Sequence, residues 1–352
     1  MKISPAGTPP AIFEDDARTP AAFARHRRVR DPIGMWYAMR RRYGQDDRIW
    51  FGLYRPGRLS PHWHTCSHRY SDALGGLALL LQEQGHAGYP PPPARPAAMP
   101  DWRTLWQQRR GLPGPAVDLR WRQLEPAAQA CVSHLPVSVL LSPAQTAAIE
   151  QVAAAMGVSS TVWLLWTADR ALRATLVEAG SVSAWVYPVN LRGSVRNVDP
   201  CANHCSSLLL RLEEGSDAQA CRRQIRARLE RHEHWRRWLL LSLGKWIGQA
   251  GVNFLYRLIQ GRPGRYAGTY ANLGRWDVPG LDGITCSAPG SPACPVAAST
   301  VVCNGRRALA CRLHPVIGGD ARGAIEFLKV WRELSLKPLV TPVHQAREAA
   351  AA

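Results

Sequence analysis

A histidine and an aspartate four residues apart form the pattern in this sequence with the most direct chemical use. Residues 66–76 read CSHRYSDALGG, so His68 follows an alternating stretch and Asp72 opens an apolar run. A histidine can act as general base because its pKa lies near neutral pH. Asp72, at a helix start, can hold the loop by pairing with an arginine. Gly75 and Gly76 would let a substrate approach the backbone. Such a pair also arises by chance, so the interpretation needs support from the rest of the chain.

Two other groups of side chains have the types that bind zinc. One alternates along a single stretch: His62, His64, Cys66 and His68. The other lies further along the chain: Cys201, His204 and Cys205. Zinc sites more often combine ligand pairs from separate elements, and no complementary pair stands out. We therefore expect no metal site and no tightly bound cofactor. No cysteine is marked as a nucleophile, and a buried structural role is expected for Cys286, Cys294, Cys303 and Cys311.

The elements around His68 can be predicted from local patterns. Residues 48–54 (RIWFGLY) are rich in β-forming side chains, and residues 62–68 alternate, so both are expected to be strands. Residues 71–84 begin with a Ser/Asp cap and continue as a helical apolar run. His68 and Asp72 are thus expected in the loop between a strand and a helix. The proline-rich residues 88–100 are expected to form an extended loop.

A second block of elements begins near residue 135. Its predicted helices start at Ser142, Ser159 and Ala321, and residues 218–260 are expected to form one long helical region, basic and then apolar. Its predicted strands are residues 135–141, 184–190, 206–212, 266–272, 298–303 and 307–314. This pattern indicates a mixed α/β protein, with a flexible basic arm (1–30), an N-terminal half (31–130) and a C-terminal half (131–352).

Four segments together resemble the HxxxD acyltransferase superfamily, which has the chloramphenicol-acetyltransferase-like fold. Its members include peptide-synthetase condensation domains, BAHD acyltransferases and wax-ester synthases. Residues 67–76 are similar to the family's His-His-x-x-x-Asp-Gly, and residues 142–176 to the helix–turn–helix of its second domain. Residues 186–212 contain a similar Pro-Val-x-x-Arg, and residues 270–280 a similar Asn-x-Gly. The chain departs from the family at Ser67, at Ala73 and in its shorter first half.

The resemblance implies a fold and a set of roles. It implies two α/β halves with a mixed sheet each, an abbreviated first half, and an active-site tunnel between them. His68 would be the general base, Asp72 would support the loop by pairing with Arg192, and Asn272 would donate to the oxyanion. Residues expected at the substrate are Ser67, Tyr70, Gly75, Gly76 and Trp276, with plain packing as the alternative for Tyr70. Trp102 and Trp106 are further candidates for the tunnel wall, although most of the 14 tryptophans are expected in the core.

The resemblance also implies an acyltransferase of lipid or natural-product biosynthesis. The acyl group would move from acyl-CoA or a phosphopantetheinyl acyl carrier protein to a hydroxyl or amine of a small-molecule or lipid acceptor. The alternative is a catalytically degenerate relative that binds an acyl chain or a carrier protein as a scaffold. Retention of His68, Asp72 and Arg192 favours the enzyme.

Composition and charge limit the remaining classes. The 352 residues include 44 Lys and Arg against 26 Asp and Glu, a net charge of +18 that suits a polyanionic partner. The arginines are spread over the chain without a nucleic-acid-binding signature, so no nucleic-acid partner is expected and a thioester donor is the favoured polyanion. A hydrophobic fraction of 46% excludes general disorder.

The expected location is the cytoplasm. The chain has no long apolar stretch or secretory leader, and its nine scattered cysteines favour a reducing compartment. Residues 235–256 mix Trp, Arg and Leu as interfacial helices do. Peripheral contact with the inner membrane face is therefore an option, although core packing over the tunnel is the favoured interpretation of this segment.

Overall fold

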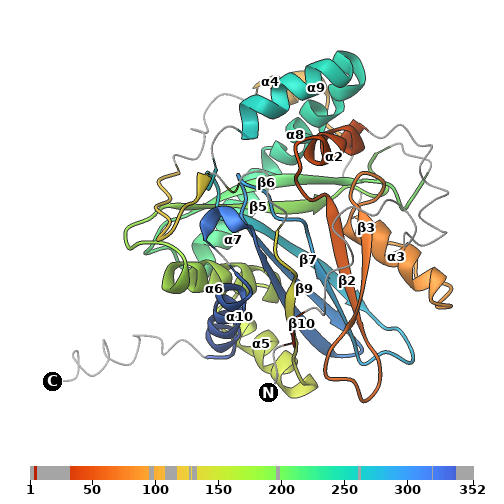
Figure 1. Cartoon of the computed structure of the whole chain (residues 1–352), viewed down its shortest axis with the longest axis vertical. Coiled ribbons are helices and arrows are strands. Elements are labelled where there is room, and N and C mark those ends of the chain that lie inside the picture. Colours follow the sequence, from red (N-terminus) through yellow and green to blue (C-terminus); the bar gives the residue numbers. More distant parts are fainter. Residues whose placement is uncertain are drawn as a thin grey trace.

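The computed structural model describes residues 4–5, 32–94, 99–107, 117–126, 128, 133–195, 199–260, 263–318 and 320–337, which form two sheets flanked by helices (Figure 1). The larger sheet has the order β1-β4-β10-β9-β7-β5-β6 and the smaller has the order β3-β2-β8. The strands of the larger sheet are β1 (Ser4–Pro5), β4 (Val137–Leu140), β5 (Ser183–Asn190), β6 (Cys205–Leu212), β7 (Gly268–Trp276), β9 (Val296–Cys303) and β10 (Arg306–Leu313). Those of the smaller sheet are β2 (Arg48–Tyr54), β3 (His62–Ser67) and β8 (Gly283–Ser287). The predicted mixed α/β class is confirmed.

The larger sheet is mixed, because β7 runs parallel to both β5 and β9 while the other pairs are antiparallel. Its main core lies against four helices: α5 (Pro143–Ala155), α6 (Ser160–Thr175), α7 (Ala218–Glu230) and α10 (Ala321–Leu336). Three tryptophans, Trp163, Trp185 and Trp331, are fully buried in this core. The packed sheet positions β5 and β6, and the segment that connects these two strands lies at the candidate site.

The smaller sheet is antiparallel throughout, which differs from the mixed sheet expected for each half. Its third strand, β8, comes from the C-terminal half of the chain, so the two halves share this sheet. On one face, α3 (Ala73–Glu83) packs against β2, where a Cβ added at Gly76 would lie 3.0 Å from the Phe51 ring. On the other, the Tyr54 hydroxyl lies 2.7 Å from that of Ser138 in β4. These contacts fix β3, and hence His68, against the larger sheet.

The segment predicted as one helical region forms three helices, α7, α8 (Glu233–Ser242) and α9 (Gly244–Gln260). His232 takes a left-handed conformation (φ 54°) between α7 and α8, and Gly248 (φ 62°) interrupts α9. With α2 (Pro32–Arg42) and α4 (Trp102–Gln107), α8 and α9 form the upper end of the molecule in Figure 1, here called the helical cap. Trp36 of α2 donates to the Leu241 carbonyl at 3.0 Å.

For the remaining segments, the structure can be compared with the prediction from the sequence only in part. Ser4–Pro5 pairs with β4, and the rest of the predicted basic arm lies outside the described residues. In the proline-rich loop, residues 88–94 and 99–100 form neither helix nor strand, and residues 95–98 lie outside the description. Within the described ranges, no single helix has the length and apolarity to cross a membrane. Helices α5 and α6 reach that length and composition only as a pair bent by 94°.

Candidate active site

His68 lies directly after β3, and its imidazole is held by an asparagine from the opposite half of the chain. The His68 backbone N–H donates to the Asp47 carbonyl at 2.8 Å. Asn203 donates from Nδ2 to the His68 carbonyl at 3.1 Å, which points its Oδ1 at Nδ1 of the ring, 3.0 Å away. An amide oxygen can only accept a hydrogen bond, so Nδ1 of His68 carries the proton. In the neutral imidazole the lone pair is therefore on Nε2.

A tyrosine ring covers one face of this imidazole. Tyr37 of α2 stacks on His68 with the ring centroids 3.8 Å apart and the planes 10° from parallel. Burial lowers the pKa of His68 to about 4 and raises the pKa of the Tyr37 hydroxyl. Both groups are therefore neutral at pH 7, and the imidazole is in the form that accepts a proton.

Asp72 is a buried carboxylate that joins three segments. It caps the N-terminus of α3 by accepting from the backbone N–H groups of Leu74 (3.1 Å) and Gly75 (3.0 Å). Its Oδ1 also lies 2.6 Å from Nη2 of Arg192, and its Oδ2 accepts from the His204 N–H at 2.9 Å. Burial disfavours the charged form, but Arg192 and these donors hold the pKa of Asp72 below its usual range. The carboxylate is thus ionised, with its hydrogen-bonding capacity used inside the protein.

Arg192 connects the loop before β6 to the loop that carries His68. It is only 4% exposed, and it donates to the carbonyls of Pro200 (2.9 Å) and Ala202 (3.1 Å) and to Oδ1 of Asn190 (3.2 Å). With Asp72 it forms a buried ion pair. The guanidinium therefore fixes the segment that presents Asn203 to His68.

Gly75, in the first turn of α3, lies where this end of the helix packs against the loop before β6. A Cβ at this position would clash with the Cys201 carbonyl oxygen and would lie 2.6 Å from the Ser71 hydroxyl, which itself donates to that carbonyl. Neither neighbour is the free end of a flexible side chain. Close packing of the protein with itself therefore requires glycine at this position.

We expect Gly75→Ala to lower the free energy of unfolding by about 1–3 kcal/mol, because α3 and the loop before β6 must move apart. Gly215→Ala is the matched control, since a Cβ there meets no atom within 4 Å. Urea unfolding of both variants measures the difference. Equal stability of the two would contradict the close packing at Gly75.

The other residues predicted for the site have varied surroundings. Ser67 donates from its hydroxyl to the Asp47 carboxylate, and Tyr70 is partly exposed beside the Arg69 guanidinium. Asn272 donates to the Thr161 hydroxyl at 2.5 Å and accepts from the Gly274 N–H at 3.0 Å, so these hydrogen bonds do not join it to the His68 loop. Trp276 is buried in the core beside α3 and β8. The structure thus brings His68, Asp72 and Arg192 together with Asn203.

Two contacts of His68 were not anticipated from the sequence, those to Asn203 and Tyr37. Asn203 lies among the side chains considered as zinc ligands, Cys201, His204 and Cys205. In the part of the chain that the structure describes, no group of three His, Cys, Asp or Glu side chains could hold a metal ion. The His204 Nε2 instead lies 2.7 Å from the Asp199 carbonyl oxygen. Residues before β6 thus hydrogen-bond to the segment that carries His68 and Asp72: Asn203 contacts His68, and the His204 N–H donates to Asp72.

Comparison with known proteins finds similarity to solved structures only. No family model matches the sequence, and no curated protein matches it. The X-domain from teicoplanin biosynthesis is similar with a TM-score of 0.50 and 12% identity, over 87% of this chain and 94% of that one. The TRI3 trichothecene 15-O-acetyltransferase from Fusarium sporotrichioides has a TM-score of 0.47 and 14% identity, over 82% of this chain and 70% of that one. The condensation domain of the enacyloxin polyketide synthase has a TM-score of 0.42 and 15% identity, over 79% of this chain and 58% of that one.

The similarity to the X-domain therefore shows that the chain has the chloramphenicol-acetyltransferase-like fold that the sequence resemblance implied. At these identities the similarity defines the fold alone, and the activity has to be argued from the site.

Proposed function

We propose that this protein is an acyltransferase that moves an acyl group from a thioester to a hydroxyl or an amine, with His68 as general base. The observation that carries the proposal is the state of the imidazole. Nδ1–H is committed to Asn203, the lone pair is on Nε2, and the lowered pKa keeps the ring neutral at pH 7. A neutral histidine with a fixed tautomer is the form that general-base catalysis requires.

In the proposed reaction, Nε2 of His68 accepts the proton of the acceptor as its oxygen or nitrogen attacks the thioester carbonyl. The tetrahedral intermediate then collapses, the carbon–sulfur bond breaks, and the electron pair leaves with sulfur. The imidazolium returns its proton to the thiolate, which restores neutral His68. Burial makes this imidazolium a stronger acid than free histidine and so favours the second proton transfer. Asp72 and Arg192 hold the loops and do not exchange protons with substrate.

For the donor we propose an acyl-CoA or an acylated phosphopantetheinyl carrier protein, and for the acceptor a small molecule or a lipid. Both donors carry phosphate, which the net charge of +18 attracts. The predicted tunnel and the oxyanion role of Asn272 remain predictions. An assay with acyl-CoA thioesters of several chain lengths, amine and alcohol acceptors, and detection of free thiol tests the proposal. Thiol release that depends on the acceptor supports it.

A binding scaffold without catalysis is the second candidate, and the stack of Tyr37 on His68 is the observation that favours it. This ring occupies one face of the imidazole at a centroid distance of 3.8 Å. A scaffold would bind an acylated carrier protein and release no thiol with any acceptor. That result would contradict the proposed enzyme.

The pH dependence of the transfer rate gives a specific prediction. The general base must be unprotonated, and burial lowers the pKa of His68 to about 4. The rate should therefore persist as the pH falls from 7 to 5 and decline only as it approaches 4. Acceptors whose own protonation is constant over this range, such as alcohols, isolate the enzyme's titration in a profile of kcat/KM. An acidic limb near pH 6.5, the usual histidine value, would contradict the buried site.

A further inference from the structure

Large apolar side chains gather on the outside of the helical cap. Of the ten large hydrophobic residues that are exposed in the described chain, seven lie on α4, on α8, on α9 or between the last two. They are Trp102, Leu239, Leu240, Leu243, Trp246, Ile247 and Phe254, here called the apolar cap surface. Trp246 is 87% exposed and Phe254 is 63% exposed. A cluster of large apolar side chains on a solvent-exposed face indicates an interaction site.

The helices that carry this surface are anchored by their other sides. Helix α8 buries His234 and Trp235, and α9 buries Val252 and Tyr256. The Tyr256 hydroxyl donates to Gln45 at 2.5 Å, and the Tyr43 hydroxyl donates to Asn253 at 2.5 Å. The favoured interpretation of residues 235–256, that they pack in the core, is therefore right for one side of these helices only. The other side presents leucine and aromatic side chains outward.

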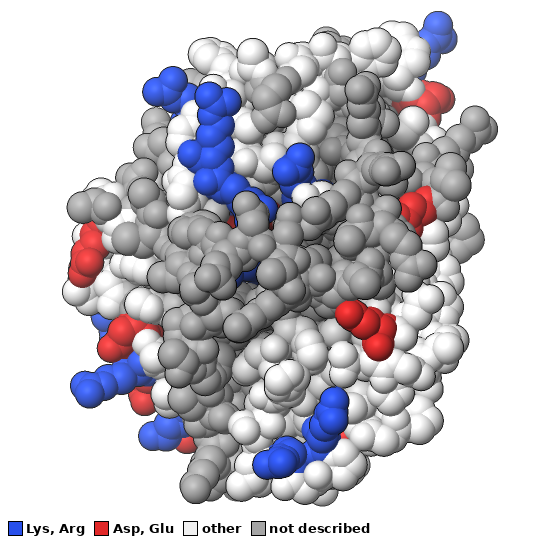
Figure 2. Space-filling view, turned by 45° about the vertical axis from the view of Figure 1, so that its right-hand side comes forward, with Lys and Arg blue, Asp and Glu red and all other residues white. Residues whose placement is uncertain are grey.

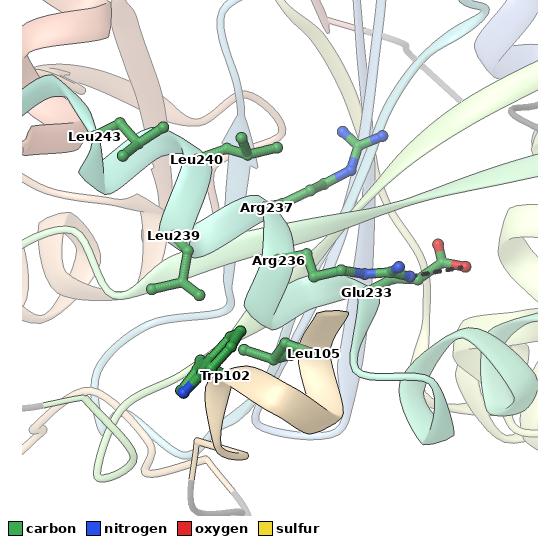
Figure 3. Close-up of a pocket in the computed structure, with 8 residues that line it drawn as sticks. All are labelled: Trp102, Leu105, Glu233, Arg236, Arg237, Leu239, Leu240 and Leu243. Atoms are coloured by element: carbon green, nitrogen blue, oxygen red, sulfur yellow. Dashed lines mark ion pairs between the residues drawn. The ribbon is translucent and has the colours of Figure 1, made fainter. Parts of the chain in front are cut away.

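A cavity of about 570 Å³ opens between α4 and α8 within this surface. In Figure 3, Trp102 and Leu105 of α4 lie opposite Leu239 of α8, and Arg236 reaches toward Glu233. Arg236 lies 4.0 Å from one carboxylate oxygen of Glu233, and Arg228 lies 2.7 Å from the other. The cavity thus combines an apolar wall with the basic side chains of Arg236 and Arg237.

Basic side chains also border the apolar cap surface. The exposed Arg103 follows Trp102 in α4, and the exposed Arg257 lies one helical turn after Phe254 in α9. In Figure 2 the upper end of the molecule, where Figure 1 places the cap, shows uncharged side chains with basic groups on both sides and an acidic group at the upper right. Exposed tryptophan, leucine and phenylalanine bordered by arginine match the interfacial region of a bilayer with anionic headgroups.

We propose that the apolar cap surface docks this protein on an anionic lipid bilayer. Trp246, Phe254 and the leucines of α8 would enter the headgroup region, while Arg103 and Arg257 would face lipid phosphates. The cavity between α4 and α8 then opens toward the lipid. This docking does not depend on the proposed acyl transfer, and a soluble acceptor should react equally well without vesicles.

Co-sedimentation of the full chain with phosphatidylglycerol/phosphatidylcholine vesicles tests the docking. We expect the double variant Trp246→Glu/Phe254→Glu to reduce partitioning on the order of tenfold or more, because two carboxylates replace two inserted rings. Leu59→Glu is the matched control, since Leu59 is 77% exposed and lies in the β2–β3 turn, outside the cap. Arg103→Gln and Arg257→Gln should each weaken binding about fivefold on anionic vesicles, with little change on neutral ones.

Circular dichroism and thermal unfolding check that the variants are folded, as substitutions at exposed positions should leave them. The proposal is overturned if the wild-type chain stays in the supernatant, or if Leu59→Glu loses as much binding as the double variant. A dimer in sedimentation velocity that the double variant dissociates would assign the surface to a second copy of the chain instead of a membrane.

Discussion

Replacing Arg192 with alanine is expected to lower the free energy of unfolding by about 3–5 kcal/mol. Asp72 is 3% exposed and its carboxylate is ionised, so removal of Arg192 leaves a buried charge without its cation. The carbonyls of Pro200 and Ala202 lose their side-chain donor in the same variant. The cost should therefore greatly exceed that of a surface ion pair.

Urea unfolding at pH 7 measures this cost, with Arg275→Ala as the matched control. Arg275 pairs with Glu150 at 3.1 Å, but both side chains are well exposed, so its loss should cost less than about 1 kcal/mol. An Arg192→Ala variant as stable as the control would contradict the buried pair.

The destabilisation of Arg192→Ala should also depend on pH. The folded protein lowers the pKa of Asp72, so the ion pair stabilises the fold above the ordinary carboxyl pKa of about 4. That contribution is lost as the pH falls through the lowered folded value. Wild type and Arg192→Ala should therefore converge in stability at acidic pH. A constant difference from pH 7 down to the acidic unfolding range would contradict this assignment.

Local patterns were sufficient for the elements whose residues favour one structure strongly. Residues 48–54 include Ile49 and the aromatic residues Trp50, Phe51 and Tyr54, and β2 has these bounds. Residues 321–336 repeat apolar side chains at helical spacing, and α10 has these bounds as well. Asp72 caps α3, and Ser142 caps α5 with Gln145 in a capping box. In each case the signal lies within a few residues of the structure it specifies.

Features that depend on distant contacts could not be predicted in this way. Strand β8 has five residues, and its pairing with β2 requires the assembled halves. The helical region 218–260 is divided where His232 and Gly248 take positive φ, which the helical spacing of its apolar residues does not indicate. Asn203 is hydrogen-bonded to His68 at a separation of 135 positions in the sequence. Tyr37, on the short helix α2, stacks on the same imidazole. Asn272 matches a sequence pattern but is hydrogen-bonded to Thr161.

The rate of acyl transfer by His68→Ala tests the proposed mechanism most directly. We expect kcat/KM to fall by about 10²–10⁴-fold, because general-base assistance is lost while the fold is retained. His62→Ala is the matched control, since His62 is exposed at the start of the same strand and should leave the rate unchanged. Acceptor-dependent thiol release from acyl-CoA or an acylated carrier protein is the readout, with circular dichroism to check folding. A folded His68→Ala protein that transfers the acyl group at the wild-type rate would contradict His68 as the base.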